Sequence, residues 1–198
     1  MSVPSLPHAA PFTVHDLFEM PDDGNRYEVL EGSLIVSPAP KPTHQLAADR
    51  LRALLVAAAA PELEVLTAVT VRLGDDGTGF VPDVVVTRTS PEDMDTRAFL
   101  DPHEVLAVVE VVSPGSRTRD RRIKADGYAA VGIPCYWRVE LTPYPGQRDI
   151  ALPVVLVHEL DGGAYQLVTT LTAGTTGEAA LPFPIRLDPA TLTGRRQR

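Results

Sequence analysis

The chain has 198 residues, of which 44% are hydrophobic and 22% charged, and its formal net charge is −8. This is the composition of a globular protein with a single core, and the acidic balance excludes a general nucleic-acid coat protein, because neutralising phosphates requires clustered Lys and Arg. The sequence contains no run of about 18 apolar residues, so it predicts no membrane span. Its single cysteine, Cys135, excludes an intrachain disulfide and two-cysteine zinc motifs. We therefore expect a cytoplasmic protein without a membrane partner.

The chain begins with a proline-rich stretch, residues 1–12, which we expect to be a flexible arm. A short helix is expected over residues 14–20, and a β-hairpin over residues 26–37. Thr43 is placed to cap a helix that runs to about Ala60 and ends before a proline. Because the apolar positions of this helix recur on one face, we expect it to pack on a sheet.

The rest of the chain alternates short apolar runs with polar loops and one helix, an order typical of a mixed sheet flanked by helices. The expected fold class is therefore α/β (α+β), with a mixed central β-sheet, flanking helices and additional β-hairpins. One domain is expected over residues 13–190, followed by a basic tail over residues 191–198. We predict one or two strands over residues 64–73, and single strands over residues 80–86, 105–112 and 135–141. We also predict a helix over residues 119–131 and a hairpin formed by residues 152–160 and 164–171.

Two of the predicted strands each contain one acid, Asp83 and Glu110. A carboxylate inside a buried strand loses hydration, which is costly unless a cation, a donor or a proton compensates it. Pro82 indicates a sheet edge or the point where the strand leaves its neighbour, and Glu110 lies near the end of its strand, so we expect both acids at one end of the sheet. A shared divalent cation, Mg²⁺ or Mn²⁺, would compensate them. The alternative is that each acid pairs with Arg138 or another buried cation.

Asp120, Lys124 and Tyr128 are spaced i, i+4 and i+8, so they share one face of the helix predicted after Glu110. If that face meets the end of the sheet, Lys124 can orient or deprotonate an attacking water and stabilise charge on a phosphorane-like transition state. A plain surface pair between Asp120 and Lys124 is the alternative. The same stretch carries a local basic cluster that is either a nucleic-acid contact or a solvated helix start: Arg117, Arg119, Arg121, Arg122 and Lys124.

Several short motifs occur in an order that resembles one known family. The motifs are RYEVLEG at residues 26–32, SPAP at residues 37–40 with HQ at residues 44–45, PD at residues 82–83, EVVSP at residues 110–114, and GIPCYW at residues 132–137. Over roughly residues 12–172 the chain thereby resembles the Uma-two family of restriction-endonuclease-like proteins, within the PD-(D/E)XK nuclease superfamily.

The resemblance implies a restriction-endonuclease-like core and Mg²⁺- or Mn²⁺-dependent hydrolysis of phosphodiester bonds, with nucleic acid, expected to be DNA, as substrate and a metal-bound water as nucleophile. By position, Asp83 and Glu110 match metal ligands, and Glu28 matches a further acid that completes the metal site. The superfamily lysine lies two residues beyond the second acid, where this chain has Val112. The resemblance implies that Lys124, on the following helix, takes this role, and that the protein is a homodimer.

Other polar residues are candidates for supporting roles. His44 and Gln45 begin the long helix and could contact a phosphate or a metal-bound water, because a helix N-terminus favours anions; capping or packing is the alternative. Asp120 and Tyr128 could likewise support the catalytic side chains or contact phosphate, and Cys135 is expected to be buried rather than nucleophilic. Two rival functions stay open: a non-catalytic binding or assembly module that retains the nuclease fold, and a carboxylate-pair glycosidase, which an aromatic content of 6% disfavours.

Overall fold

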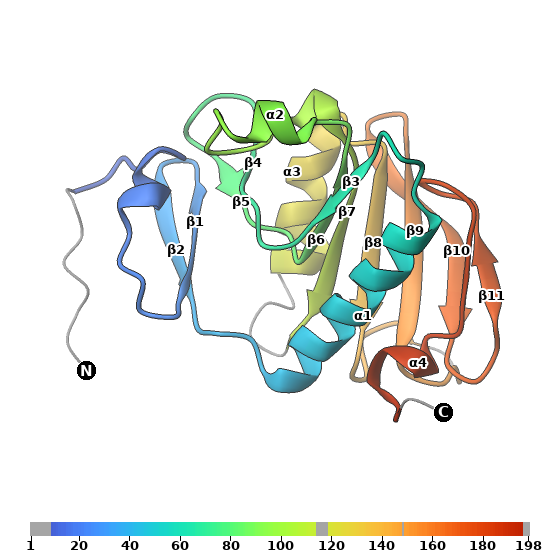
Figure 1. Cartoon of the computed structure of the whole chain (residues 1–198). Coiled ribbons are helices and arrows are strands. Elements are labelled where there is room, and N and C mark those ends of the chain that lie inside the picture. The colour runs from blue at the N-terminus through green and yellow to red at the C-terminus, as the bar shows by residue number, and fades with distance from the viewer. Residues whose placement is uncertain (1–8, 114–118, 148, 196–198) are drawn as a thin grey trace.

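The computed structural model describes residues 9–113, 119–147 and 149–195, apart from the side chains of residues 119 and 120. These residues form a six-stranded sheet, a four-stranded sheet and a two-stranded ribbon, with helices packed around them (Figure 1). None of the helices in the described ranges has the length and apolar character that crossing a bilayer requires.

The six-stranded sheet is the centre of the fold, with the strand order β10-β9-β8-β7-β6-β3. It is mixed, because β7 (Val105–Val112) and β8 (Cys135–Glu140) run parallel while every other neighbouring pair is antiparallel. The predicted mixed central sheet is therefore confirmed. Its other strands are β3 (Glu64–Leu66), β6 (Val84–Thr87), β9 (Val154–Asp161) and β10 (Ala164–Thr172).

Helices α1 (Pro42–Ala58) and α3 (Lys124–Ala130) pack on opposite faces of this sheet. Side chains alternate along β7, so Val109 and Val111 join the core cluster beneath α1, whereas Val108 joins the cluster that contains Tyr128 of α3. Glu110 shares the side of β7 occupied by Val108 and is therefore directed toward α3. The alternation of the strand thus decides which helix the acid meets.

Both long predicted helices form, with changes at their starts. Lys41 occupies the N-cap of α1 and Pro42 its first turn, so Thr43 lies inside the helix rather than capping it. A π-helical turn, η3 (Arg119–Ile123), precedes α3 and forms the first part of the helix predicted over residues 119–131. The predicted capping role of Thr43 is therefore wrong, because the helix already begins at Pro42.

The four-stranded sheet has the order β2-β1-β5-β4 and contains the predicted hairpin, β1 (Arg26–Leu30) and β2 (Ser33–Ser37). Two predicted strand regions are divided between the sheets. Of the one or two strands expected over residues 64–73, two form, β3 and β4 (Val71–Arg72), and they lie in different sheets, separated by Ala68 at φ 54°. The strand expected over residues 80–86 becomes β5 (Gly79–Phe80) and β6, so residues 81–83 cross from one sheet to the other. Since β6 lies inside its sheet, Pro82 marks this crossing and not an edge.

Short elements complete the chain and extend the ordered domain beyond residues 13–190. Phe12 and Leu192 are both buried, so structure reaches into the predicted arm and tail. The helix expected over residues 14–20 is reduced to the 3₁₀ turn η1 (Asp16–Glu19). The other short elements are α2 (Pro91–Met94), η2 (Pro102–Glu104), β11 (Gly177–Ala179), β12 (Ile185–Leu187) and α4 (Ala190–Thr193).

Candidate functional site

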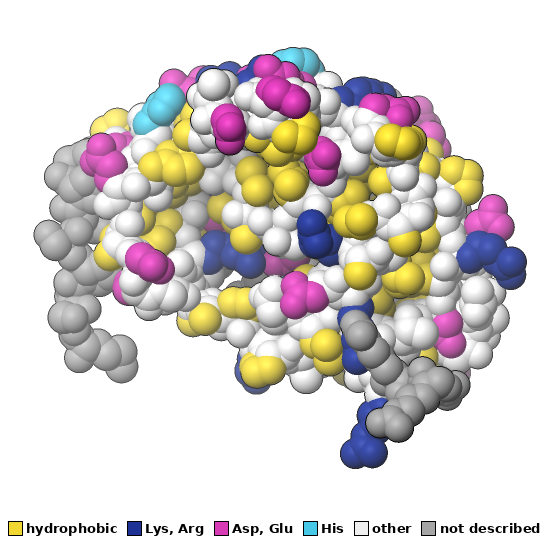
Figure 2. All heavy atoms as spheres, viewed as in Figure 1, with side chains coloured by type: hydrophobic (Ala, Val, Ile, Leu, Met, Phe, Trp, Pro, Cys, Tyr) yellow, Lys and Arg dark blue, Asp and Glu magenta, His cyan; other side chains and the backbone are white. Residues whose placement is uncertain are grey.

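A cavity of about 530 Å³ opens where the four-stranded sheet meets the end of the central sheet. The space-filling view shows a hollow at this place with basic and acidic side chains inside it (Figure 2). Its wall combines charged residues with an apolar rim from the β2–α1 connection and the end of β8. The charged and histidine side chains that line the cavity are Arg26, Glu28, Lys41, His44, Asp83, Glu110 and Lys124.

Asp83 reaches this cavity because the chain crosses between sheets immediately before β6. Its backbone N–H donates to the carbonyl of Val109 (3.1 Å), and its Oδ2 accepts a hydrogen bond from the backbone N–H of Val111 (2.8 Å). The side chain is therefore fixed to the end of β7, on which Glu110 lies. The expectation that both acids lie at one end of the sheet is met by the backbone pairing.

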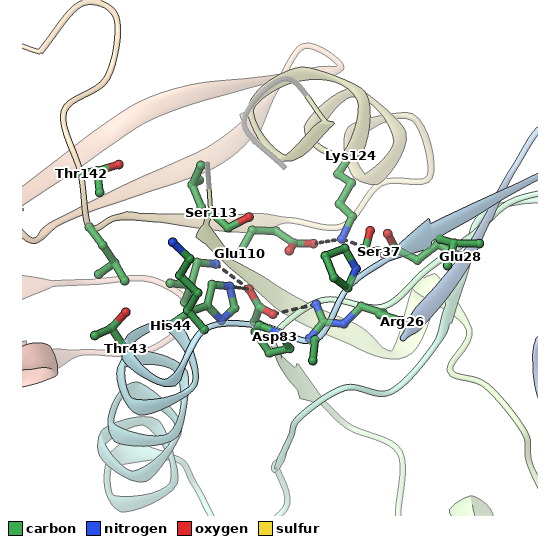
Figure 3. Close-up of a pocket in the computed structure, with 18 residues that line it drawn as sticks. Arg26, Glu28, Ser37, Thr43, His44, Asp83, Glu110, Ser113, Lys124 and Thr142 are labelled. Atoms are coloured by element: carbon green, nitrogen blue, oxygen red, sulfur yellow. Dashed lines mark hydrogen bonds and ion pairs between the residues drawn. The ribbon is translucent and has the colours of Figure 1, made fainter. Parts of the chain in front are cut away.

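Two cationic or ionisable side chains contact Asp83 (Figure 3). Arg26 Nη1 lies 2.8 Å from Oδ1, and His44 Nε2 lies 3.2 Å from Oδ2. Burial alone would raise the pKa of Asp83, but the hydrogen bond and charge of His44, followed by those of Arg26, outweigh it and lower this pKa to about 2. Burial likewise opposes the charge of His44, yet Asp83 raises the pKa of His44 above its ordinary value of 6.5.

Glu110 is held by two donors from α3. Lys124 Nζ lies 2.9 Å from Glu110 Oε1, and the hydroxyl of Tyr128 donates to the same oxygen at 2.8 Å. Burial, together with the charges of Glu110 and Glu28, raises the pKa of Tyr128 well above 10, so this phenol remains a hydrogen-bond donor at neutral pH. The predicted common face of Lys124 and Tyr128 is thus present and is buried against the sheet.

Glu28, on β1 of the other sheet, meets the same lysine. Its Oε1 lies 2.7 Å from Lys124 Nζ and accepts a hydrogen bond from the backbone N–H of Val81 at 2.8 Å. Lys124 is only 2% exposed, and Glu28 and Glu110 are each 1% exposed. One buried ammonium therefore bridges two carboxylates that belong to different sheets.

Some of the expected residues do not join this group. Gln45 is exposed and donates to Asp49 at 2.9 Å, which is a contact along the helix surface. The side chain of Asp120 lies outside the described residues, and so does Arg117 of the basic cluster. Arg121 forms a two-point ion pair with the buried Glu140, with both contacts at 2.8 Å. The residues that the structure brings together are Glu28, His44, Asp83, Glu110, Lys124 and Tyr128.

The sequence left open that Asp83 and Glu110 pair with Arg138 or another buried cation of the protein. In the structure Asp83 pairs with Arg26 and Glu110 pairs with Lys124. Arg138 lies 3.2 Å from Glu140 instead. The roles of Arg26 and of Lys41, which also lines the cavity, were not predicted. One signal was available: the sequence contains only two lysines, Lys41 and Lys124, and both line this cavity.

The carboxylate oxygens of the site are the kind of ligand that a hard divalent cation prefers. Within residues 9–113, 119–147 and 149–195, no group of three or more His, Cys, Asp or Glu side chains is arranged to hold a metal. Mg²⁺ typically uses one or two carboxylates and completes its shell with water and phosphate oxygens. Asp83 and Glu110 could supply these two carboxylates, although each of them, like Glu28, also contacts protein donors.

Comparisons with known proteins give one family and one fold. A family model described as "Uma2: Putative restriction endonuclease" matches residues 14–192. The structure is also similar to the crystal structure of "a putative nuclease belonging to DUF820" from Anabaena variabilis ATCC 29413, with a TM-score of 0.65 and 16% sequence identity over 92% of this chain and 98% of that chain. At this identity the likeness concerns the fold alone. No curated protein sequence matches the chain.

Proposed function

Because this chain belongs to the Uma2 family of restriction-endonuclease-like proteins, we propose that it hydrolyses phosphodiester bonds of nucleic acid in the cavity between its two sheets. The observation that carries the proposal is the meeting of Asp83, Glu110 and Lys124 at one end of the central sheet. Two acids and a lysine, buried and fixed by hydrogen bonds, are suited to stabilising charge on a phosphoryl group. DNA is the substrate that we favour.

Asp83 and Glu110 would hold a divalent cation, Mg²⁺ or Mn²⁺, which when bound supplies Lewis-acid polarisation and lowers the pKa of water. Lys124 would donate hydrogen bonds from its ammonium to the attacking water or to a phosphate oxygen. The N–H of Val111 fixes the carboxylate of Asp83, and Tyr128 fixes that of Glu110, so neither acid has to reorganise when substrate binds.

The charges of the site agree with a cationic cofactor and an anionic substrate. The three carboxylates of Glu28, Asp83 and Glu110 face the guanidinium of Arg26 and the ammonium of Lys124. This group carries one net negative charge when His44 is neutral and no net charge when His44 is protonated, the form that its raised pKa favours, so in neither state does it repel a divalent cation. With that cation present the group becomes positive and attracts a phosphodiester. Lys41, at the edge of the cavity, adds a further positive charge toward the substrate.

The test is cleavage of fluorescently labelled single- and double-stranded DNA and RNA with Mg²⁺, Mn²⁺ or a chelator. We expect metal-dependent cleavage by the wild type and a loss of about 100-fold or more in Asp83→Asn and Glu110→Gln, as is usual when a group that stabilises transition-state charge is removed. Glu92→Gln is the matched control, because Glu92 is exposed on α2. Equal cleavage by all four proteins would overturn the proposal.

One observation favours the alternative of a non-catalytic binding or assembly module. Asp83, Glu110 and Glu28 already have protein cations or donors as partners, so the fold does not need a metal to compensate them. Calorimetric titration with Mn²⁺ separates the two functions. Binding that is lost in Asp83→Asn supports the nuclease, whereas no binding at millimolar Mn²⁺ supports the module.

We also propose a homodimer, as the family resemblance implies. The β9–β10 hairpin is the candidate interface, because β10 forms the edge of the central sheet and exposes Leu167 and Val168. Sedimentation analysis of the wild type beside Leu167→Lys tests this, and a monomeric wild type would refute it.

A further inference from the structure

We propose that Glu28 is a positioning residue for Lys124 rather than a metal ligand. The inference rests on the proposed function, because it assigns a role in placing the lysine that acts on the phosphodiester. Glu28 is the acid for which sequence position alone suggested a third metal-binding carboxylate, and its contacts in the structure lead to a different role.

The contacts of Lys124 show why a second carboxylate is needed. Its Nζ lies 2.9 Å from Glu110 Oε1, but this oxygen also accepts the hydrogen bond of Tyr128. The shorter contact, 2.7 Å, is to Glu28. A lysine side chain has four rotatable bonds and loses considerable rotamer freedom when it is fixed. Two carboxylates on different sheets fix the ammonium at a point that neither could define alone.

Glu28 also connects this lysine to the segment that carries the first acid. The oxygen that contacts Lys124 accepts the backbone N–H of Val81, two residues before Asp83 in the crossing between the sheets. Glu28 is 1% exposed, so both contacts are made away from solvent and are little screened. A single carboxylate oxygen therefore sets the relative position of Lys124 and the Asp83 segment.

The chain offers a pair of substitutions that separates the charge of Glu28 from the hydrogen bonds that its oxygen accepts. Glu28→Gln keeps an oxygen that can accept the N–H of Val81 and removes the charge that holds Lys124. Glu28→Ala removes both contacts. Glu31→Gln is the control, because Glu31 is an exposed residue at the turn of the same hairpin. Thermal unfolding of each variant verifies that the fold is retained.

The first measurement is steady-state cleavage together with Mn²⁺ calorimetry. We expect Glu28→Gln to lower kcat by about 100-fold, the usual effect of misplacing a catalytic group by about 1 Å, with KM and Mn²⁺ affinity close to those of the wild type. Glu28→Ala should lose more, and Glu31→Gln should lose nothing. If Glu28→Gln weakens Mn²⁺ binding as strongly as Asp83→Asn does, Glu28 is a metal ligand and the inference is wrong.

A second measurement does not depend on activity. The two lysines of the chain can be trace-labelled with acetic anhydride and quantified by mass spectrometry, with Lys41 as the internal reference. We expect Lys124 to react slowly in the wild type and in Glu31→Gln, and several-fold faster relative to Lys41 in Glu28→Gln. An unchanged ratio would overturn the positioning role. If the wild type cleaves no nucleic acid, the proposed function fails, and this ratio still decides whether Glu28 holds Lys124.

Discussion

Replacing Lys124 by Met tests the buried ion-pair network most severely. The unbranched thioether fills much of the same space and can contact the Phe80 ring, which lies 5.8 Å from the lysine nitrogen. The substitution removes the cation that bridges Glu28 and Glu110, which are both 1% exposed. Removing one partner of a buried ion pair typically costs about 3–5 kcal/mol, because the remaining charge loses its compensation. We therefore expect the free energy of unfolding to fall by about that amount at pH 7.

Urea unfolding followed by the fluorescence of Trp137 gives this free energy directly, because Trp137 is the single tryptophan of the chain and is buried in the core. The double variant Lys124→Met/Glu28→Gln should regain part of the loss at pH 7. A deficit below about 1 kcal/mol would refute the network, because an exposed pair is worth no more than that.

Three further predictions address other parts of the account. The pKa of Asp83 is lowered from 3.8 to about 2, so its ionised form stabilises the fold above pH 3.8, and this contribution disappears as the pH falls through about 2. The free energy of unfolding of the wild type should therefore exceed that of Asp83→Asn by about 2 kcal/mol at pH 5, and the difference should vanish near pH 2. A difference that does not depend on pH would contradict the lowered pKa of Asp83. Lys41→Ala should weaken oligonucleotide binding and reduce the salt slope by about one without changing urea unfolding; an unaltered slope would place the phosphates elsewhere. Leu192→Ala should lower the free energy of unfolding by about 2–5 kcal/mol, because Leu192 is buried in the core. A negligible change would indicate that residues 191–198 contribute nothing to the stability of the domain.

The parts of the fold that could be predicted are those governed by local patterns. The hairpin over residues 26–37, the long helix and the two acid-bearing strands each carry a short-range signal in periodicity or turn residues. Asp83 and Glu110 could be placed at one end of the sheet because Pro82 and Ser113-Pro114 mark where regular pairing stops. These signals need no knowledge of which strands become neighbours.

The features that could not be predicted depend on tertiary pairing. Nothing in residues 64–73 indicates that the run is shared between two sheets, and Pro82 marks where pairing stops in residues 80–86 without telling that the chain crosses there to a second sheet. The partner of Asp83 was missed for the same reason: Arg26 precedes it by 57 residues and reaches it only because β1 pairs with β5. Glu28 was assigned by family resemblance alone, and a linear motif does not tell whether a carboxylate faces a cation binding site or a lysine.

The most direct test of the account is a crystal structure of the protein with Mn²⁺ and a short oligonucleotide, using anomalous scattering to locate the ion. We predict one or two Mn²⁺ peaks in contact with Asp83 and Glu110, a phosphate beside Lys124, and Glu28 still within hydrogen-bond distance of the lysine nitrogen. Mn²⁺ and phosphate bound away from this cavity, or no Mn²⁺ at all, would contradict the claim that these residues form a phosphodiester-cleaving site.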